Sequence, residues 1–284
     1  MNAFRQFRTL ALGGILAISA GCGLLPEQID KTEGWSAQQF YTTAKDHAES
    51  GNYQTAAKYY ETLQARYPFG RYAQQAQLEL IYVYHKDGQI DQAVAAADRF
   101  IRTYPRHPSV DYAYYMRGLV NFNRGNSGIA ERLLPTDPEK TDTSIAMQAF
   151  NDFAELVERF PDSRYADDAA QRMVFLRNNM AAYEIHVADY YMRRKAHVAA
   201  ANRAKYVLEN FARTPAAANA LAILTEAYLE MGMEDLAADS LRVLQMNHPE
   251  FPRLGELTAR VNGTEYTPTE REGWSVTSLL GLGS

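Results

Sequence analysis

The sequence contains a single cysteine among 284 residues, and only 11 prolines and 17 glycines. One cysteine cannot build a disulfide framework or a cysteine metal cluster within a monomer. Hydrophobic residues make up 46% and charged residues 22% of the chain, which excludes a mainly disordered protein, a collagen-like fibre and a protein with many membrane spans. The formal net charge is -5, so the chain lacks the positive charge that a nucleic-acid binder needs.

The sequence motifs of common enzymes are also missing. There is no P-loop, no glycine-rich dinucleotide-binding turn and no G-x-S-x-G nucleophile motif. None of the six histidines stands at metal-ligand spacing from another histidine or from a glutamate. The sequence therefore predicts a protein that is not an enzyme and that binds neither a cofactor nor a metal ion.

Tyrosine, in contrast, is abundant. The chain has 19 tyrosines and many alanines, a composition that predicts stacked helices. Small residues allow such helices to approach closely, and aromatic rings fill the gaps between them. The composition thus favours an all-α fold.

Regularly spaced helix ends support this fold class. Predicted helices end at five similar points, which lie 37, 56, 51 and 37 residues apart, at Tyr67, Tyr104, Phe160, Phe211 and His248. The consensus of the tetratricopeptide repeat can be aligned on these points. In the first, second and fifth units, residues of the expected type then fall at its apolar, small and glycine positions. We therefore predict an α-solenoid of five tetratricopeptide-like helical hairpins.

The predicted solenoid covers residues 36–252, in units of about 36–70, 71–107, 108–162, 163–213 and 214–250. If 37 residues form one unit, the third unit holds 19 extra residues, which we expect in a surface loop over residues 126–141. The fourth holds 14 extra residues, which predict a long helix from about residue 163 to 194.

The C-terminal segment, residues 253–284, does not continue this pattern. Its glycines and polar residues predict a disordered tail. The alternative is a short linear motif that docks Trp274 and the last leucines on a partner or on a membrane.

The first 22 residues have the features of an export signal. Arg5 and Arg8 precede an apolar run over residues 10–20, and small residues precede Cys22. This pattern resembles the bacterial lipobox, in which signal peptidase cuts before a cysteine that then carries S-diacylglycerol and an N-acyl chain. The lipobox usually has leucine at the position of Ser19.

We therefore expect a lipoprotein signal peptide over residues 1–21, lipidation at Cys22 and an acylated tether over residues 22–35. By the same resemblance, Gly23 after the cysteine favours sorting to the outer membrane. The alternative is an ordinary secretory signal that is followed by an incidental free cysteine.

The candidate functional features are helix surfaces. The first helices of tetratricopeptide hairpins line a concave face that can bind an extended peptide or a helix. In the first two units we select Tyr41, Tyr82 and Gln77 as candidate peptide contacts, since Tyr41 and Tyr82 lie off the signature positions of the repeat. The alternative is that these side chains belong to the solenoid core.

Two stretches resemble the BamD, or ComL, family of outer-membrane barrel-assembly lipoproteins: RYPFGRYAQQAQLELIY over residues 66–82 and DYAYYMRGL over residues 111–119. The resemblance covers roughly residues 36–249 and extends to the lipobox. It implies a subunit of the machinery that inserts β-barrel proteins into the outer membrane, anchored by lipid on the periplasmic face. In that family the C-terminal repeats dock on the periplasmic domains of the barrel subunit BamA, and the N-terminal repeats are proposed to receive unfolded barrel proteins. Other lipoproteins of the complex also bind this subunit in that family.

The resemblance further implies a partner-binding role for Asn202 and Arg203, which match a family position that faces BamA. We expect Arg203 to pair with a partner carboxylate, and we expect its replacement to change thermal stability little. The alternative for this residue is a solvated arginine. The alternative for the whole protein is a periplasmic tetratricopeptide lipoprotein that coordinates cell-wall synthesis or division by protein-protein binding.

Overall fold

The computed structural model describes residues 32–126 and 143–266, which form α-helices and turns with no β-strand among them. The helices pair in sequence into five hairpins: α2 (Ala37–Glu49) with α3 (Tyr53–Arg66), α4 (Arg71–Lys86) with α5 (Ile90–Thr103), α6 (Val110–Asn126) with α8 (Ser144–Arg159), α9 (Ala166–Arg193) with α10 (His197–Asn210), and α11 (Ala216–Glu230) with α12 (Glu234–Asn247). A single helix, α13 (Leu254–Asn262), follows them. The predicted all-α solenoid of helical hairpins is confirmed.

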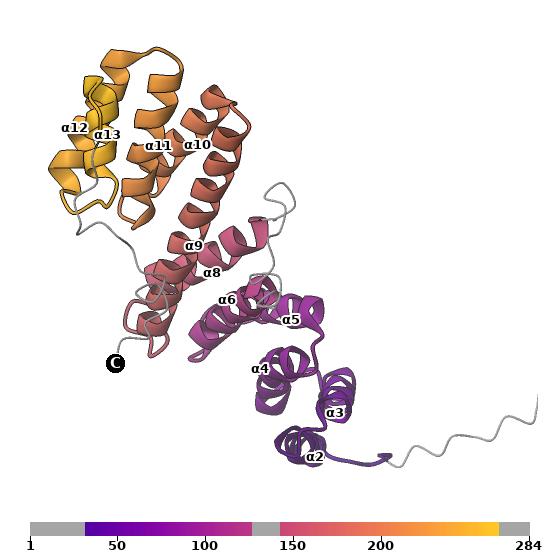
Figure 1. Ribbon diagram of the computed structural model, residues 1–284. Coiled ribbons are helices and arrows are strands. Elements are labelled where there is room, and N and C mark those ends of the chain that lie inside the picture. The colour runs from indigo at the N-terminus through magenta and orange to yellow at the C-terminus, as the bar shows by residue number, and fades with distance from the viewer. Residues whose placement is uncertain (1–31, 127–142, 267–284) are drawn as a thin grey trace, which may run out of the picture.

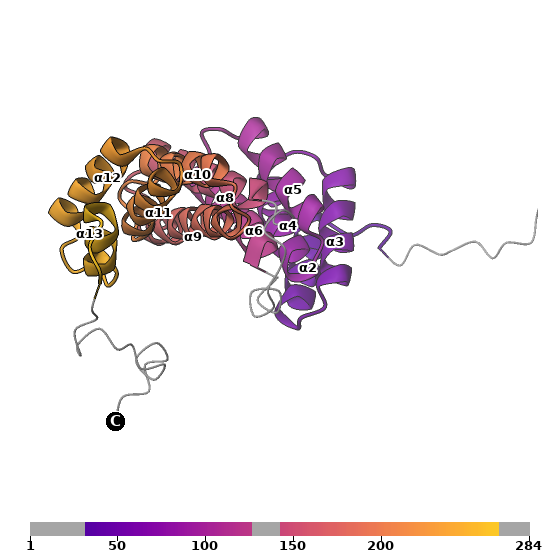
Figure 2. The ribbon, with the colours of Figure 1, turned by 45° about the horizontal axis from the view of Figure 1, so that its top comes forward.

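The hairpins stack one after another into an elongated array (Figure 1). Helix α2 lies at one end of the array and α12 and α13 lie at the other, as the turned view in Figure 2 also shows. Each hairpin packs mainly against the hairpins next to it in sequence. Such a one-dimensional stack leaves extended surfaces along the helices that are available for binding.

Two columns of buried residues repeat along the second helices of the hairpins. Fully buried alanines form the first column, at Ala56, Ala93, Ala149, Ala200 and Ala237. Seven residues after each alanine, on the same helix face, stands a larger and fully buried apolar residue: Leu63, Phe100, Leu156, Val207 and Leu244. The alanines let the paired helices approach closely, and the larger side chains fill the space between hairpins.

The turn inside a hairpin needs a residue with a left-handed backbone. Glycine supplies it in the first, second and fifth hairpins, where Gly51, Gly88 and Gly232 have φ angles of 77°, 76° and 69°. The fourth hairpin has no glycine at this point, and Lys195 takes the same conformation with φ of 59°. The turn geometry is therefore kept even where the sequence lacks its usual residue.

The extra residues of the fourth unit extend α9, which is one 28-residue helix that continues through Asn178 and Asn179. It packs against α8, α10 and α11, so it joins the third hairpin to the last two (Figure 1). None of the described helices is both long enough and apolar enough to span a membrane.

A helix, α13, lies inside the segment that the sequence predicted to be a disordered tail. Leu257 of α13 is fully buried and packs with Leu221 of α11 and with Leu241 and Leu244 of α12. The prediction of a disordered tail is therefore wrong for residues 254–262, where a nine-residue helix covers the end of the core. Several predicted segments lie outside the described residues: 267–284, residues 127–141 of the predicted loop over 126–141, the signal peptide, Cys22 and most of the tether.

We expect Gly118→Ala to lower the free energy of unfolding by about 1–3 kcal/mol. A Cβ atom at Gly118 on α6 would lie 2.7 Å from two ring carbons of Phe153 on α8, and the buried ring has little room to move. Urea denaturation followed by circular dichroism measures the effect. Gly255→Ala on the exposed side of α13 is the control, and it should be neutral or stabilising by up to about 1 kcal/mol. If Gly118→Ala is as stable as the unmodified protein, the contact does not limit packing.

Candidate partner-binding surfaces

Tyrosine side chains gather where the first helices of the N-terminal hairpins lie side by side. The ring centroid of Tyr41 on α2 lies 5.6 Å from that of Tyr72 on α4. Tyr112 on α6 lies 5.8 Å from Tyr165, which precedes α9. Tyr82 on α4 packs against both of the core clusters on which these two pairs lie. We call these five partly exposed residues the tyrosine surface.

A carboxylate, Glu79 of α4, lies within the tyrosine surface. The Tyr41 hydroxyl donates a hydrogen bond to Glu79 Oε1 at 3.3 Å, and Gln75 Nε2 donates to the same oxygen at 3.1 Å. Burial, together with the negative charge of Glu79, raises the pKa of Tyr41 to about 12 and also raises the pKa of Tyr112. Both hydroxyls therefore stay protonated well above neutral pH, and that of Tyr41 donates to Glu79.

A cation stands at each end of α4 beside this surface. The Arg71 guanidinium carbon lies 4.8 Å from the ring centroid of Tyr72, and its Nη2 donates to the Tyr72 hydroxyl at 3.1 Å. Lys86 Nζ lies 5.6 Å from the ring centroid of Tyr82. Aromatic faces, hydroxyls and flanking positive charge together suit an extended peptide that carries both aromatic and acidic groups.

Gln77 is not part of the tyrosine surface. It lies five residues from both Tyr72 and Tyr82, and five residues rotate a side chain by about 140° around a helix. Gln77 is buried and lines a cavity of about 330 Å³ between α3, α4 and α5. The structure thus brings the two predicted tyrosines to one surface and places the predicted glutamine on a different side of α4.

Arg203 and Asn202 lie on the exposed side of α10. Arg203 Nη1 donates a hydrogen bond to Glu184 Oε2 of α9 at 3.0 Å. Glu184 is only 8% exposed, so Arg203 is the partner of a nearly buried carboxylate. We expected replacement of Arg203 to change thermal stability little, but this pair predicts a loss of stability, because the replacement would leave that carboxylate without its cation. The other donors of the guanidinium remain available at a side chain that is 46% exposed.

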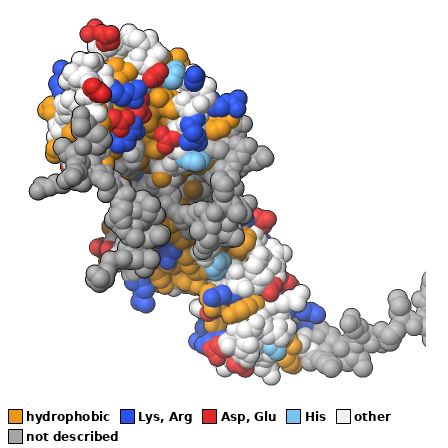
Figure 3. Space-filling model, in the orientation of Figure 1, with side chains coloured by type: hydrophobic (Ala, Val, Ile, Leu, Met, Phe, Trp, Pro, Cys, Tyr) orange, Lys and Arg blue, Asp and Glu red, His pale blue; other side chains and the backbone are white. Residues whose placement is uncertain are grey.

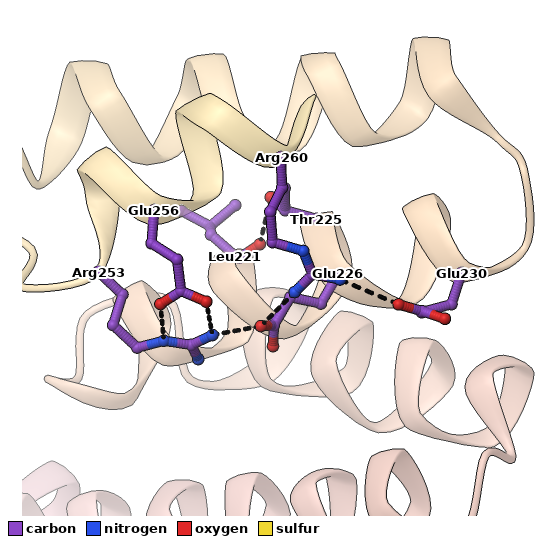
Figure 4. A network of polar contacts seen from close by, with 7 residues as sticks. All are labelled: Leu221, Thr225, Glu226, Glu230, Arg253, Glu256 and Arg260. Atoms are coloured by element: carbon purple, nitrogen blue, oxygen red, sulfur yellow. Dashed lines mark hydrogen bonds and ion pairs between the residues drawn. The ribbon is translucent and has the colours of Figure 1, made fainter. Parts of the chain in front are cut away.

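The C-terminal hairpins carry a second surface, which is charged (Figure 3). Arg253 bonds to both carboxylate oxygens of Glu256 at 3.0 and 3.1 Å and pairs with Glu226 of α11 (Figure 4). Arg260 of α13 bonds to Glu226 at 3.0 Å and to Glu230 at 2.9 Å. We call these five residues the charged surface. Their ion pairs fix α13 against α11 and present charges of both signs to solvent.

A partly buried ion-pair cluster lies in the middle of the solenoid. Arg117 of α6 bonds to Asp98 of α5 at 2.9 Å and to Glu155 of α8 at 2.6 Å, and its Nε lies 2.8 Å from Asp152 Oδ1 of α8. Asn121 Nδ2 donates to the other oxygen of Asp152 at 2.7 Å. Burial raises the pKa of Asp152, while the neighbouring Arg117 acts in the opposite direction. The cluster joins the second hairpin to the third.

Reasoning from sequence did not select Glu79 or Glu184. For Glu79 a signal existed, because Tyr72, Gln75, Glu79 and Tyr82 follow one another at helical spacings of three and four residues, which places them on one face. For Glu184 no such signal exists, since its partner comes from the next helix. Within residues 32–126 and 143–266, no group of three His, Cys, Asp or Glu side chains is arranged to hold a metal ion.

Solved structures of tetratricopeptide proteins are distant from this chain. A thermophilic TPR protein from Thermus thermophilus is 16% identical, and the match covers 80% of this chain and 98% of the other at a TM-score of 0.35. The repeat assignment therefore rests on the hairpins themselves and on their two buried columns.

Several proteins of known name share much higher sequence identity with this chain. The profile of the YfiO family, described as an outer membrane lipoprotein, matches residues 34–244. The outer membrane protein assembly factor BamD of Neisseria meningitidis serogroup B is 44% identical over 87% of this chain and 92% of its own length. The factor of the same name from Xylella fastidiosa Temecula1 is 42% identical over 78% of this chain and 75% of its own, and that from Vibrio cholerae is 36% identical over 83% and 97%. With this extent of similarity, the chain belongs to the BamD family of outer membrane protein assembly factors.

Proposed function

We propose that the protein is a non-catalytic subunit of the outer-membrane β-barrel assembly machinery, which scaffolds the complex and helps receive and insert unfolded barrel proteins. Family membership over most of the chain is the observation that carries this proposal. The open helical surfaces agree with it, because a solenoid offers long binding faces.

The tyrosine surface is the proposed site for unfolded barrel proteins. Tyr41 and Tyr82 present aromatic faces beside Glu79 and the hydroxyl of Tyr41, which stays protonated. Arg71 and Lys86 add positive charge that can pair with acidic groups or with a terminal carboxylate of a peptide. Such a surface binds an extended chain through stacking and hydrogen bonds without demanding one sequence.

The C-terminal hairpins are the proposed docking site for the barrel subunit of BamA type, through its periplasmic domains. Arg203 has further donors at the surface of α10, and the charged surface lies on the neighbouring helices α11 and α13. Complementary charges on a partner would steer association and fix its orientation. Other lipoproteins of the complex are further proposed partners.

Attachment to the outer membrane is proposed to occur through Cys22. The export signal and the small residues before this cysteine support a lipid anchor with the solenoid facing the periplasm.

A pull-down in mild detergent followed by mass spectrometry tests the proposed function. The tagged full-length protein should recover a barrel protein with periplasmic domains and further lipoproteins. Recovery of cell-wall synthesis or division proteins without any barrel subunit would reject the proposal and favour the alternative function.

Tyr82→Ala should weaken peptide binding roughly tenfold, because an aromatic anchor on a binding surface typically contributes this much. The probe is a labelled synthetic peptide from the last strand of an outer-membrane barrel protein, and its binding is measured by fluorescence anisotropy. Tyr206→Ala on α10, another partly exposed tyrosine, is the matched control and should leave affinity unchanged. Equal losses in both variants would show that the tyrosine surface has no special role.

Arg203→Glu should weaken binding to the barrel subunit roughly tenfold or more. It should also lower thermal stability, because it places a second carboxylate beside Glu184. Surface plasmon resonance, at a temperature where circular dichroism shows the variant to be folded, measures the affinity.

A second variant separates the two effects of Arg203. Arg203→Ala combined with Glu184→Gln removes both the cation and the buried charge, so stability should recover while binding stays weak. Lys205→Glu, a charge change two residues away on α10, is the control for general electrostatics. Unchanged affinity in Arg203→Glu would remove this residue from the interface.

A further inference from the structure

One side of α12 exposes large apolar side chains around the exposed ion pair of Asp239 with Arg242, and Met233 just before the helix adds to them. Met233, Leu236, Val243 and Met246 are 46%, 45%, 41% and 76% exposed. Leu236 and Val243 lie two helical turns apart on the same side, and the two methionines extend the row to a length of about 20 Å. We call this row the α12 stripe.

The side of α12 that faces the core is already occupied. Ala237, Leu241 and Leu244 are buried, and Gln245 Nε2 donates to Thr258 Oγ1 of α13 at 3.1 Å. Helix α13 therefore covers the side of α12 that faces away from the stripe. No helix among the described parts of the chain covers the stripe itself, and exposed apolar rows of this kind mark contact surfaces.

The end of α13 brings the following residues close to the stripe. Arg260 Nη2 donates to Glu230 Oε1 at 2.9 Å, and Glu230 is the last residue of α11. The turn to α12, and with it Met233, follows directly. Seven residues separate Tyr266 from Trp274, and the eight residue steps between the two can span up to about 26 Å when extended. The segment after residue 266 therefore starts within reach of the whole stripe.

The composition of that segment matches the stripe. Residues 273–284 contain no charged side chain, whereas 22% of the whole chain is charged. This short stretch carries several large apolar residues: Trp274, Val276, Leu279, Leu280 and Leu282. Burying two apolar surfaces against each other is favourable, and attachment to the same chain gives the segment a high effective concentration at the stripe.

We propose that residues 274–282 dock on the α12 stripe of the same chain and cover the outer side of the last hairpin. The inference does not depend on the proposed function, because it rests on the exposed stripe, the position of the end of α13 and the composition of the segment. A protein that binds the outer side of α12 would have to displace this segment.

Photo-crosslinking of the full-length protein tests the proposal. The photoreactive residue benzoylphenylalanine replaces Val243, and in a control protein it replaces Phe69, which is 90% exposed at the other end of the solenoid. Trypsin cleaves after Arg271, so docking should yield a crosslink to the peptide 272–284 in protein of monomer size, at least tenfold more from position 243 than from position 69. A crosslink only to another protein, a crosslinked dimer or no crosslink from position 243 would overturn the proposal.

A charged variant shows whether the contact is apolar. Leu236→Glu, with the photoreactive residue still at position 243, should reduce the crosslink at least tenfold, because it places a charge in the stripe. Circular dichroism should show unchanged helix content, since Leu236 is largely exposed. A crosslink of undiminished yield in this folded variant would contradict apolar docking.

Discussion

Cys22→Ala, exported behind a cleavable secretory signal that replaces residues 1–21, should release the protein from the outer membrane into the soluble periplasmic fraction. A single acyl chain gives only marginal and reversible membrane binding, whereas S-diacylglycerol together with an N-acyl chain supplies the several chains that stable anchoring needs. Loss of the one cysteine of the chain should therefore remove nearly all stable attachment.

The measurement must separate lipid attachment from protein contacts. Membranes are washed with high salt, which weakens protein partners but does not extract acyl chains. Gly21→Ala is the matched control, because it keeps a small residue before Cys22 and should leave the protein in the membrane fraction. A Cys22→Ala protein that is exported and still resists the wash would show that another feature holds it at the membrane.

The repeat architecture was predictable because it depends on residues close together in sequence. Each hairpin places alanine and a large apolar residue seven positions apart on its second helix, as Ala56 and Leu63 do in the first hairpin. Helical spacing alone puts the two on one buried face. The long α9 was predictable for a similar reason, since its extra residues contain neither glycine nor proline.

The pairing of charged residues was not predictable, because the partners lie on different helices. The sequence predicts an exposed arginine at position 203, but it does not show that Glu184 of α9 lies beside it. The sequence predicts a surface amide at Gln77, but the packing of α4 against α3 and α5 buries this side chain. Helix α13 is short and lies between Pro252 and Gly263, so its single buried leucine gives little periodic signal. In each case tertiary packing decides what local spacing leaves open.

Arg117→Met should be the most destabilising of the substitutions considered, at about 3–5 kcal/mol. The side chain of Arg117 is only 14% exposed, and it pairs with carboxylates from α5 and α8 at the same time. Methionine fills part of the volume but carries no charge. Asp152, which is 8% exposed, would then lose its cation and keep only the hydrogen bond from Asn121.

Urea denaturation followed by circular dichroism measures the loss. Adding Asp152→Asn to Arg117→Met should recover a large part of it, because the second change removes the buried charge and keeps a side chain of similar size. Arg242→Met, which breaks the exposed pair of Arg242 with Asp239 on α12, is the matched control and should cost less than about 1 kcal/mol.

The position of the cluster predicts where Arg117→Met should act. In a solenoid, each hairpin depends on the interface with its neighbours, and Arg117 ties α5 of the second hairpin to α8 of the third. Hydrogen exchange should therefore become faster first in α5, α6 and α8, while α11 and α12 stay protected. Uniform loss of protection along the whole chain would mean that the solenoid unfolds as one unit and that the cluster is not a local link. Protection that stays unchanged in α5 would show that the apolar columns hold the two hairpins together without it.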